Sequence, residues 1–240
     1  MSHGLPLPGI GDAHRPVPVG GAAFFDVDNT LIRGSSLYQL GLGLHARGVV
    51  SAMDFVRLGR HRLGYALGRT EKKRNSSTVG RSAGAVARGL HAAALHAEVE
   101  VIVRERIMPR VRPAVLAAAR EHQAQGQQVW LVTASVQPLA EILARQLRLT
   151  GAMGSKVVLV DGFYTGEPDG PLLHGKVKAE AVLRLAAAKG FDLSASSAYS
   201  DSVNDIPLLH VVGHPRPVCP DRRLRKYASA QGWRVFSDER

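Results

Sequence analysis

The sequence predicts an α/β fold built on a parallel sheet, because three short apolar runs end in polar residues and helical patterns separate them. The runs are Ala22–Phe25, Gln128–Val132 and Ser197–Ser200. A short apolar run that ends in acidic or turn-forming residues is typical of a buried strand. Strands that alternate with helices form a parallel sheet covered on both faces. Ligands of such sheets bind beyond the carboxyl ends of the strands, so the residues after each run form the candidate site.

Length and composition agree with such a core carrying an insertion. The chain has 240 residues, of which 45% are hydrophobic and 21% charged, which is enough apolar material for a buried core. Its 31 Lys and Arg against 20 Asp and Glu give a formal net charge of +11. This charge favours an anionic partner, such as a phosphorylated metabolite, nucleic acid or an acidic membrane surface. Cys219 is the single cysteine, which excludes an internal disulfide and a cysteine-based zinc site.

Two regions differ from the predicted core. Residues 1–20 are rich in proline and glycine and lack an apolar stretch after a basic start, so we expect a flexible tail and not a secretory signal. Residues 34–109 contain no strand pattern, and their leucines recur at helical spacing (Leu37, Leu40, Leu44). We therefore expect a helical insertion. It holds 12 Lys and Arg against 5 Asp and Glu, so most of the net charge lies in it.

The remaining elements follow from periodicity and turn residues. Asp161-Gly162 lies between two apolar runs and predicts a hairpin turn. The other expected elements are helices at 138–147, 176–189, 204–209 and 222–230, and strands at 157–160, 163–165, 217–219 and 233–236. We expect residues 21–33 and 110–240 to form one core around the insertion.

Carboxylates gather after the first and third strands. Asp26 and Asp28 stand two residues apart after the first strand, and Asp201 and Asp205 follow the third. Phosphoryl transfer through a covalent intermediate needs a carboxylate nucleophile, a nearby acid or base, and a cation at the phosphoryl oxygens. Mg²⁺ prefers oxygen ligands and needs only one or two carboxylates. Taken alone, each cluster is more often a turn or a capped helix start.

Thr133 and Lys176 suit an anion. Thr133 follows the second strand, and the backbone N–H groups of Ala134 and Ser135 begin a turn that can receive phosphate oxygens. Lys176 follows Gly175 at an expected helix start, where the positive end of the helix dipole disfavours a lysine. Its position suggests an anion in front of it, although most single lysines lie on solvated surfaces.

Two glycine patterns are set aside. Gly41-Leu42-Gly43-Leu44-His45-Ala46 fits a dinucleotide-binding fingerprint, but it lies within the helical insertion and does not follow a strand. The segment from Gly170 to Lys176 begins like a phosphate-binding P-loop, but Val177 stands where a serine or threonine would hold Mg²⁺.

In combination, these segments resemble the haloacid dehalogenase-like superfamily, and more narrowly its subfamily IB, which includes phosphoserine phosphatase. The matching motifs are Asp26-Val27-Asp28-Asn29-Thr30-Leu31, Thr133 after Val129–Val132, Lys176 in Gly175-Lys176-Val177, and Tyr199-Ser200-Asp201-Ser202-Val203-Asn204-Asp205. They occur in the family's order and cover roughly residues 21–236. The resemblance implies a Rossmann-like core with an inserted α-helical cap of the C1 type, and residues 34–109 stand where that cap is expected.

The resemblance also implies a role for each motif residue. Asp26 is expected to be the nucleophile that forms an aspartyl-phosphate, and Asp28 the general acid and base. Asp26, Asp201 and the Asp28 backbone carbonyl would hold Mg²⁺. The groups expected to contact the phosphoryl oxygens are Thr133, Ala134, Lys176 and Asn204. Asp205 would orient Lys176 or metal-bound water. The presence of Asp28 favours phosphate ester hydrolysis, since the dehalogenases of this fold lack that acid.

One departure from the family concerns the substrate. Phosphoserine phosphatases typically carry a glutamate nine residues after the nucleophile, where it pairs with the substrate's amino group. Here Ser35 stands at that position, followed by Ser36. A neutral hydroxyl does not supply the charge-assisted contact that an ammonium group favours. Both serines are therefore substrate-specificity candidates, and phosphoserine becomes one candidate among several small phosphate monoesters.

The expected function is Mg²⁺-dependent hydrolysis of a small phosphorylated metabolite. The alternatives are transfer of the phosphoryl group to an acceptor alcohol, hydrolysis of a lysophospholipid or polyol phosphate, and a basic nucleic-acid- or membrane-binding protein with a vestigial site. The intact motif set argues against the last, so no nucleic acid partner is expected. No apolar run reaches the roughly 20 residues that span a bilayer. We therefore expect a cytoplasmic protein, with peripheral membrane contact left open.

Overall fold

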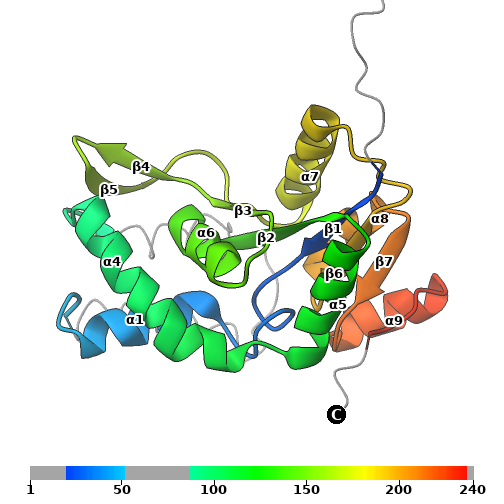
Figure 1. The fold of residues 1–240 in the computed structure, drawn as a ribbon, viewed down its shortest axis with the longest axis horizontal. Helices are drawn as coiled ribbons and strands as arrows, with labels where there is room; N and C mark the ends of the chain where they lie inside the picture. Colours follow the sequence, from blue (N-terminus) through cyan, green and yellow to red (C-terminus); the bar gives the residue numbers. More distant parts are fainter. Residues whose placement is uncertain (1–19, 52–86, 237–240) are drawn as a thin grey trace, which may run out of the picture.

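The computed structural model of the chain describes residues 20–51 and 87–236. Within these ranges the core is a five-stranded sheet in the order β3-β2-β1-β6-β7 (Figure 1). Its strands are β1 (Ala22–Phe25), β2 (Gln128–Val136), β3 (Gly151–Ser155), β6 (Ser197–Ser200) and β7 (His214–Pro217). All neighbouring strands run parallel. The expected α/β fold with a parallel sheet is confirmed, and the expected N-terminal tail and the middle of the insertion lie outside the described residues.

Helices connect the strands and cover the sheet. Their bounds are α1 (Ser36–Ala46), α4 (Ala92–Ile102), α5 (Pro113–Ala124), α6 (Gln137–Gln146), α7 (Lys176–Lys189), α8 (Ile206–His210) and α9 (Arg222–Ala230). A π-helical turn, Val103–Ile107, continues α4, and short 3₁₀ turns follow at Met108–Arg110 and Val203–Asp205. Within the described residues, no helix is both long and apolar enough to cross a membrane.

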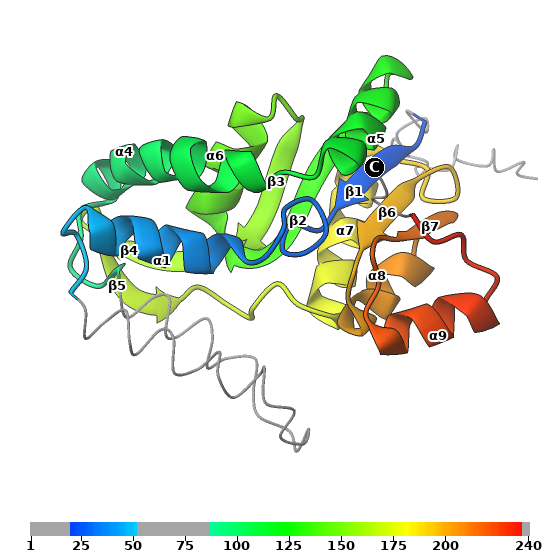
Figure 2. The ribbon, with the colours of Figure 1, turned by 90° about the horizontal axis from the view of Figure 1, so that it is seen from below.

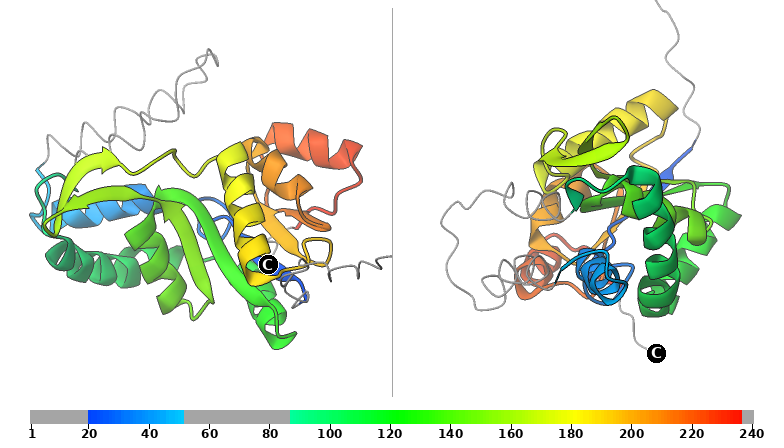
Figure 3. Two further views of the ribbon diagram at one scale, coloured as in Figure 1. Left: turned by 90° about the horizontal axis from the view of Figure 1, so that it is seen from above. Right: turned by 90° about the vertical axis from the view of Figure 1, so that its left-hand side faces the viewer.

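Strand β1 occupies the centre of the sheet, and all four of its residues are buried. Because side chains of a strand alternate between its faces, Phe25 and Phe24 enter different parts of the core. Phe25 belongs to a buried cluster with residues of α5 and α6, and Phe24 to a second cluster with residues of α7, α8 and α9. Figure 3 shows these two groups of helices on either side of the sheet. Because helices cover both faces of the sheet, all residues of β1 are buried, and this explains why the strand is apolar along its whole length.

The described part of the insertion lies at one end of the sheet (Figures 1 and 2). Helices α1 and α4 pack closely there. A Cβ atom on Gly43 would lie 2.6 Å from the side chain of Ile102, so only glycine permits this approach. The dinucleotide-like pattern Gly41-Leu42-Gly43 is therefore part of a helix–helix contact, as its place in a helical pattern predicts.

The hairpin expected around Asp161-Gly162 is present. Strands β4 (Val157–Val160) and β5 (Phe163–Pro168) pair antiparallel. Asp161 and Gly162 have φ angles of 50° and 81°, the left-handed values of a two-residue hairpin turn.

The hairpin is bonded to the insertion. The Ala92 N–H donates to the Gly162 carbonyl at 2.8 Å, and the Tyr164 N–H donates to the Leu90 carbonyl at 3.1 Å. The ring of His91 meets that of Phe163 edge-on at 5.0 Å between centroids. Strands β4 and β5 therefore contact the start of α4, although the sequence analysis assigns them to the core.

Several expected elements differ in the structure. Strand β7 lies three residues earlier than the expected 217–219, and residues 233–236 form no strand beyond a bridge between Val218 and Phe236. The expected helix at 204–209 begins as a 3₁₀ turn because Pro207 stands at its second helical residue. Helix α5 and strand β3 were not predicted. The β3 sequence, Gly151-Ala152-Met153-Gly154-Ser155, has no apolar run and is a strand only through its pairing with β2.

Candidate active site

The candidate site lies where three parallel strands end side by side. Strand β1 pairs with β2 on one side and with β6 on the other. Asp26 follows the last residue of β1, and Asp201 follows the last residue of β6. On β2, Leu131 pairs with Phe25, so Thr133 lies beside the first residues after β1. The topology therefore brings all three predicted polar clusters to one edge of the sheet, as expected for a doubly covered parallel sheet.

A tight loop after β1 fixes the position of the second carboxylate. Asn29 adopts a left-handed conformation with φ of 59°. Its backbone N–H donates to the Gly34 carbonyl at 3.0 Å, and its Oδ1 accepts from the Gly34 N–H at 3.2 Å. Asparagine tolerates this conformation better than most residues. The loop turns the chain so that α1 begins beside Asp28.

Asp28 lies at the N-terminus of α1. Its Oδ1 accepts a hydrogen bond from the Ser36 backbone N–H at 2.8 Å. The first N–H groups of a helix have no partner within the helix and favour an anion. The other Asp28 oxygen makes no hydrogen bond to any residue that the structure describes. One oxygen of the Asp28 carboxylate thus fixes the position of the group, and the other is available to a ligand.

Lys178, and not Lys176, is the lysine of this site. Lys178 Nζ donates to Asp26 Oδ1 at 2.8 Å and to Asp205 Oδ2 at 2.7 Å. Lys178 is 2% exposed, whereas Lys176 is exposed at the surface. Two residues along a helix correspond to a rotation of about 200°, so only one of the two lysines can face the carboxylates. The expectation that Lys176 faces the site is wrong.

Helical spacing explains why Lys178 points inward. Lys178, Val182 and Ala186 are four residues apart and form the buried face of α7. Lys178 continues this apolar face to the end of the helix nearest the strand ends. The helix begins at Lys176, as the sequence predicts, and the spacing of Val182 and Ala186 is the signal that distinguishes Lys178 from Lys176.

Asp205 is buried and anchors the lysine. It is 2% exposed, and its Oδ2 also accepts from the Ser200 hydroxyl at 2.8 Å. Its Oδ1 is buried without a hydrogen-bond partner within the described part of the chain. The expected positioning role of Asp205 thus concerns Lys178, while its second oxygen has capacity for a further donor.

Thr30 links the two carboxylates at the ends of β1 and β6. Its side chain is fully buried, and its Oγ1 lies 3.0 Å from Asp26 Oδ2 and 3.2 Å from Asp201 Oδ1. The same oxygen accepts from the Asp201 backbone N–H at 3.0 Å. A hydroxyl has one proton, so it donates to one carboxylate at a time. Thr30 belongs to the recognised motif, but no role was predicted for it, because a threonine after two aspartates is also an ordinary turn residue.

Burial and mutual repulsion raise the pKa values of Asp26 and Asp201. The pKa of Asp26 rises from 3.8 to about 6, chiefly through burial, although the Lys178 ammonium opposes the shift. The pKa of Asp201 rises to about 7, again through burial and then through the negative charge of Asp26. The pKa of Lys178 is raised because Asp26 and Asp205 outweigh its desolvation. Two carboxylates, Asp26 and Asp205, therefore share one ammonium, while Asp201 lies near Asp26 without a cation of its own in the described part of the chain, so the cluster has room for more positive charge.

The other predicted residues have the following contacts. Thr133 is buried, and its Oγ1 accepts from the Ser135 N–H at 3.1 Å. The Ala134 carbonyl accepts from the Ser155 hydroxyl at 2.9 Å. Asn204 Nδ2 donates to Ser202 Oγ at 3.3 Å. These contacts hold the loops in place, and the expected phosphate contacts of these residues stay predictions.

Ser35 and Ser36 differ in their surroundings. Ser35 is the N-cap of α1, and its Oγ accepts from the Tyr38 N–H at 3.4 Å. Ser36 is 1% exposed, and its Oγ has no partner among the described residues. Ser35 therefore has a structural task that a serine performs well. The involvement of either serine in substrate recognition stays a prediction.

A parallel sheet that gathers carboxylates and a buried lysine at its strand ends defines an α/β protein with a polar ligand site beyond the ends of its strands. The comparison with family models assigns the chain more narrowly. Residues 23–210 match the model of the haloacid dehalogenase-like hydrolases, and the chain belongs to that family. The expected resemblance and the expectation of an enzyme are both confirmed.

Individual relatives agree with this assignment. The chain is 40% identical over 224 residues to a Mycobacterium tuberculosis protein named phosphoserine phosphatase SerB1, covering 93% of this chain and 73% of the relative. A crystal structure of a protein of unknown function from Bordetella pertussis superposes with a TM-score of 0.78 at 27% identity and covers 93% of this chain and 100% of that one. A phospho-aspartyl intermediate analogue of phosphoserine phosphatase has a TM-score of 0.65 at 18% identity over 92% of this chain and 94% of that one, which is a likeness of fold.

Proposed function

We propose that the chain is a phosphatase that hydrolyses a small phosphate monoester through an aspartyl-phosphate at Asp26. The observation that carries the proposal is the environment of the Asp26 carboxylate. One of its oxygens accepts from Lys178 and the other from Thr30, at the end of the central strand. A buried carboxylate held by a cation is oriented for attack on phosphorus, and the ammonium offsets charge on the phosphoryl oxygens.

Asp28 supplies the acid and base of the proposed reaction. An Asp26 oxygen attacks phosphorus, the bond from phosphorus to the ester oxygen breaks, and the leaving alkoxide takes a proton from Asp28. Water then attacks the aspartyl-phosphate, gives its proton to Asp28, and releases inorganic phosphate with Asp26 restored. The Asp28 oxygen that has no partner within the described residues supports this role, because the other is occupied by the Ser36 N–H.

The donor set of the site suits Mg²⁺. Asp26 and Asp205 share the single Lys178 ammonium, and burial, with repulsion between the carboxylates, raises the pKa values of Asp26 and Asp201 to about 6 and about 7. No group of three His, Cys, Asp or Glu side chains converges as a metal site within the described ranges. Mg²⁺ needs only one or two carboxylates and keeps several waters, so Asp26, Asp201 and the Asp28 carbonyl would hold it. When bound, it would neutralise charge on the phosphoryl group.

Phosphoserine is one candidate substrate. The relative named phosphoserine phosphatase SerB1 supports it. Ser35 argues against an ammonium contact at its position, because its hydroxyl caps α1. The substrate class we propose is therefore a small phosphate monoester whose leaving group is not recognised through a cation at Ser35. A cytoplasmic location agrees with such a substrate and stays a prediction.

The test is phosphate release from a panel of phosphorylated amino acids, sugars, nucleotides, polyol phosphates and lysophospholipids, with and without Mg²⁺. Wild-type protein is expected to release phosphate from at least one class only when Mg²⁺ is present. Asp26→Asn is expected to abolish release and to keep the wild-type circular dichroism spectrum. Turnover by Asp26→Asn at the wild-type rate would overturn the proposal.

A competing alcohol separates hydrolysis from phosphoryl transfer. Product analysis in the presence of glycerol is expected to give inorganic phosphate as the main product. A new phosphate ester of glycerol as the main product would identify a transferase instead.

A further inference from the structure

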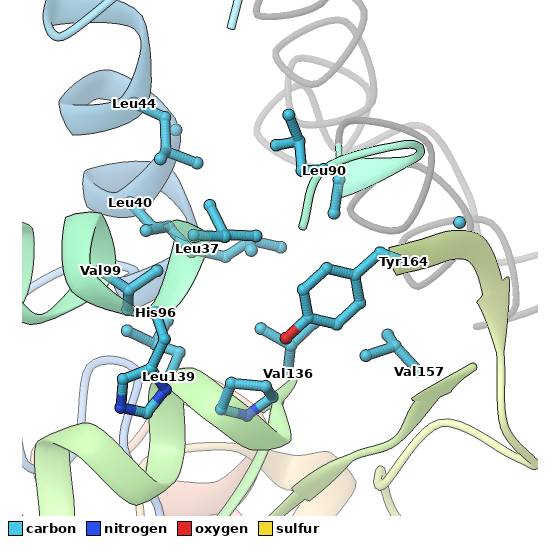
Figure 4. Close-up of a pocket in the computed structure, with 15 residues that line it drawn as sticks. Leu37, Leu40, Leu44, Leu90, His96, Val99, Val136, Leu139, Val157 and Tyr164 are labelled. Carbon is cyan, nitrogen blue, oxygen red and sulfur yellow. The ribbon is translucent and has the colours of Figure 1, made fainter. Parts of the chain in front are cut away.

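An apolar pocket lies between the insertion, the hairpin and the core, at the same edge of the sheet as the carboxylates. Its cavity volume is about 60 Å³. Figure 4 shows its walls: Leu40 and Leu44 of α1, Val99 of α4, Leu139 of α6 and Val157 of β4. The side chains on four separate elements are thus aliphatic, which is the lining of a site for a hydrocarbon group.

One hydroxyl group points into this apolar space. Tyr164 is 7% exposed, and Figure 4 shows its ring entering the pocket with the hydroxyl directed toward Val136. The hydroxyl makes no hydrogen bond to any residue in the described ranges, and burial raises its pKa. A tyrosine hydroxyl in an apolar setting normally has a partner. The ring is buried, while the hydroxyl oxygen is not among the fully buried atoms, so a ligand or water in the pocket can reach it.

The second polar ring at the pocket is already paired. His96 Nε2 lies 3.2 Å from Glu100 Oε1. Its imidazole therefore faces a carboxylate of its own helix, and no Lys or Arg stands among the described residues that line the pocket. Together with the neutral side chains of Ser35 and Ser36 at the start of α1, this described lining favours an uncharged leaving group.

The pocket begins close to the predicted catalytic residues. Val136 in its wall is three residues along β2 from Thr133, a distance of about 10 Å for an extended strand. Leu37 in its wall is the neighbour of Ser36, whose N–H holds Asp28. A phosphate at the strand ends and a chain in the pocket are therefore within the reach of one small molecule.

The hairpin extends the apolar lining toward solvent. Leu159 pairs with Tyr164 across β4 and β5, so both side chains lie on the same face of the hairpin. Leu159 is 48% exposed. Gly41 and Gly166 also line the pocket, and because they have no side chains, the wall at these two positions is formed by backbone. The pocket thus has an apolar approach as well as an apolar interior.

We infer that the pocket holds the hydrocarbon part of the leaving group, so that the substrate is a phosphate monoester of an alcohol with a straight alkyl chain. The inference rests on the proposed phosphatase function for the position of the phosphate. The aliphatic walls favour a saturated chain, because Tyr164 is the single aromatic ring that lines the pocket in the described residues besides His96. The Tyr164 hydroxyl would then donate to an oxygen carried by the chain.

Binding of alkyl phosphonates tests the pocket without turnover. Ethyl, butyl, hexyl and octyl phosphonate are titrated into the full-length protein with Mg²⁺ and followed by calorimetry. Each buried methylene is expected to tighten binding about fourfold. Equal affinity along the series would overturn the inference, whatever the protein does to phosphate esters.

A pocket-filling variant tests the location. Gly41 lies in α1 and lines the pocket, so Gly41→Leu places a side chain at the pocket wall while leucine keeps a high helix propensity. The preference for octyl over ethyl phosphonate is expected to fall at least tenfold in Gly41→Leu. Ala97→Leu adds the same side chain at an exposed position of α4 and is expected to keep the wild-type preference. An unchanged preference in Gly41→Leu would place the chain elsewhere and overturn the inference.

Turnover separates this inference from the proposed function. Wild-type protein is expected to hydrolyse octyl phosphate with a higher kcat/KM than ethyl phosphate. Chain-dependent binding without hydrolysis of any alkyl phosphate would support the pocket and contradict the phosphatase. Hydrolysis at equal kcat/KM for all chain lengths would support the phosphatase and contradict the pocket.

Discussion

Lys178 Nζ donates to Asp26 Oδ1 at 2.8 Å, and both side chains are buried. The same ammonium donates to Asp205 Oδ2 at 2.7 Å. A buried cation shared by two carboxylates holds all three groups in one geometry, since removing any of them leaves an uncompensated charge. This triad connects α7, the end of β1 and the turn after β6, and it orients the proposed nucleophile before a substrate binds.

Replacement of Lys178 tests its role in the reaction. Lys178→Met removes the charge that offsets the phosphoryl oxygens and frees Asp26, so we expect kcat to fall by about 10²–10³. The measurement is steady-state phosphate release with the substrate that the panel identifies. Wild-type kcat in Lys178→Met would contradict the role.

Lys176→Met is the matched control for this change. Lys176 is exposed and lies on the other side of the same helix turn, so its replacement is expected to change kcat less than about twofold. The two variants together decide between the lysine expected from sequence and the lysine found at the site.

Thr30 is expected to set the geometry of the two carboxylates. Thr30→Val keeps the shape of the side chain but leaves the Asp201 N–H and an Asp26 oxygen without their partner, which should destabilise the fold by about 1–3 kcal/mol. We also expect the Mg²⁺ concentration for half-maximal activity to rise about 10–100-fold, because residues behind metal ligands orient them. Thr30→Ser retains the hydroxyl, so it should keep most of the wild-type stability and most of the wild-type affinity for Mg²⁺. If the Thr30→Val protein needs the same Mg²⁺ concentration as the wild type, Thr30 does not orient the metal-binding carboxylates and contributes only to packing.

Much of the fold could be predicted from sequence, because its strands are short apolar runs with polar ends. The bounds of β1, β6, α7 and α9 agree with the sequence analysis, and their order implies that Asp26, Thr133 and Asp201 meet. Strand β3 could not be predicted in this way, since its small residues form a strand only beside β2. Tertiary pairing decides the structure of such a segment.

The site was less predictable than the fold, because side-chain direction depends on packing. The sequence contains Lys176 and Lys178 at the start of one helix, and both follow Gly175 closely. Only the burial of Val182, one helical turn beyond Lys178, distinguishes the lysine that faces the carboxylates. Likewise, Ser35 was interpreted by its motif position, while its contact with the Tyr38 N–H makes it a helix cap.

Stability of the metal-free protein is expected to fall as pH rises. The folded state holds protons on Asp26 up to about pH 6 and on Asp201 up to about pH 7, whereas the unfolded chain releases them near pH 4. Between these values the native state binds more protons, so the free energy of unfolding decreases with pH. We expect a loss of up to about 4 kcal/mol between pH 5 and pH 8, measured by urea denaturation in EDTA.

Mg²⁺ should reverse this loss. Deprotonated carboxylates bind a cation more tightly, so added Mg²⁺ is expected to stabilise the protein more at pH 8 than at pH 5. Asp201→Asn removes one titrating group and should flatten the dependence on pH. A metal-free protein that gains stability from pH 5 to pH 8 would contradict the raised pKa values of Asp26 and Asp201.

Asn29 is expected to contribute through its backbone conformation and through its side chain. At φ of 59° an alanine is strained, and Asn29→Ala also loses the bond from Oδ1 to the Gly34 N–H. The two effects together should lower the free energy of unfolding by about 1–2 kcal/mol. Asn29→Gly accepts the same φ and loses only the hydrogen bond, so it should be the milder change, with a loss below about 1 kcal/mol. Urea denaturation of both variants gives the comparison. Equal losses in the two would assign the effect to the side chain alone, and no loss in Asn29→Ala would mean that the loop before α1 does not depend on the left-handed residue.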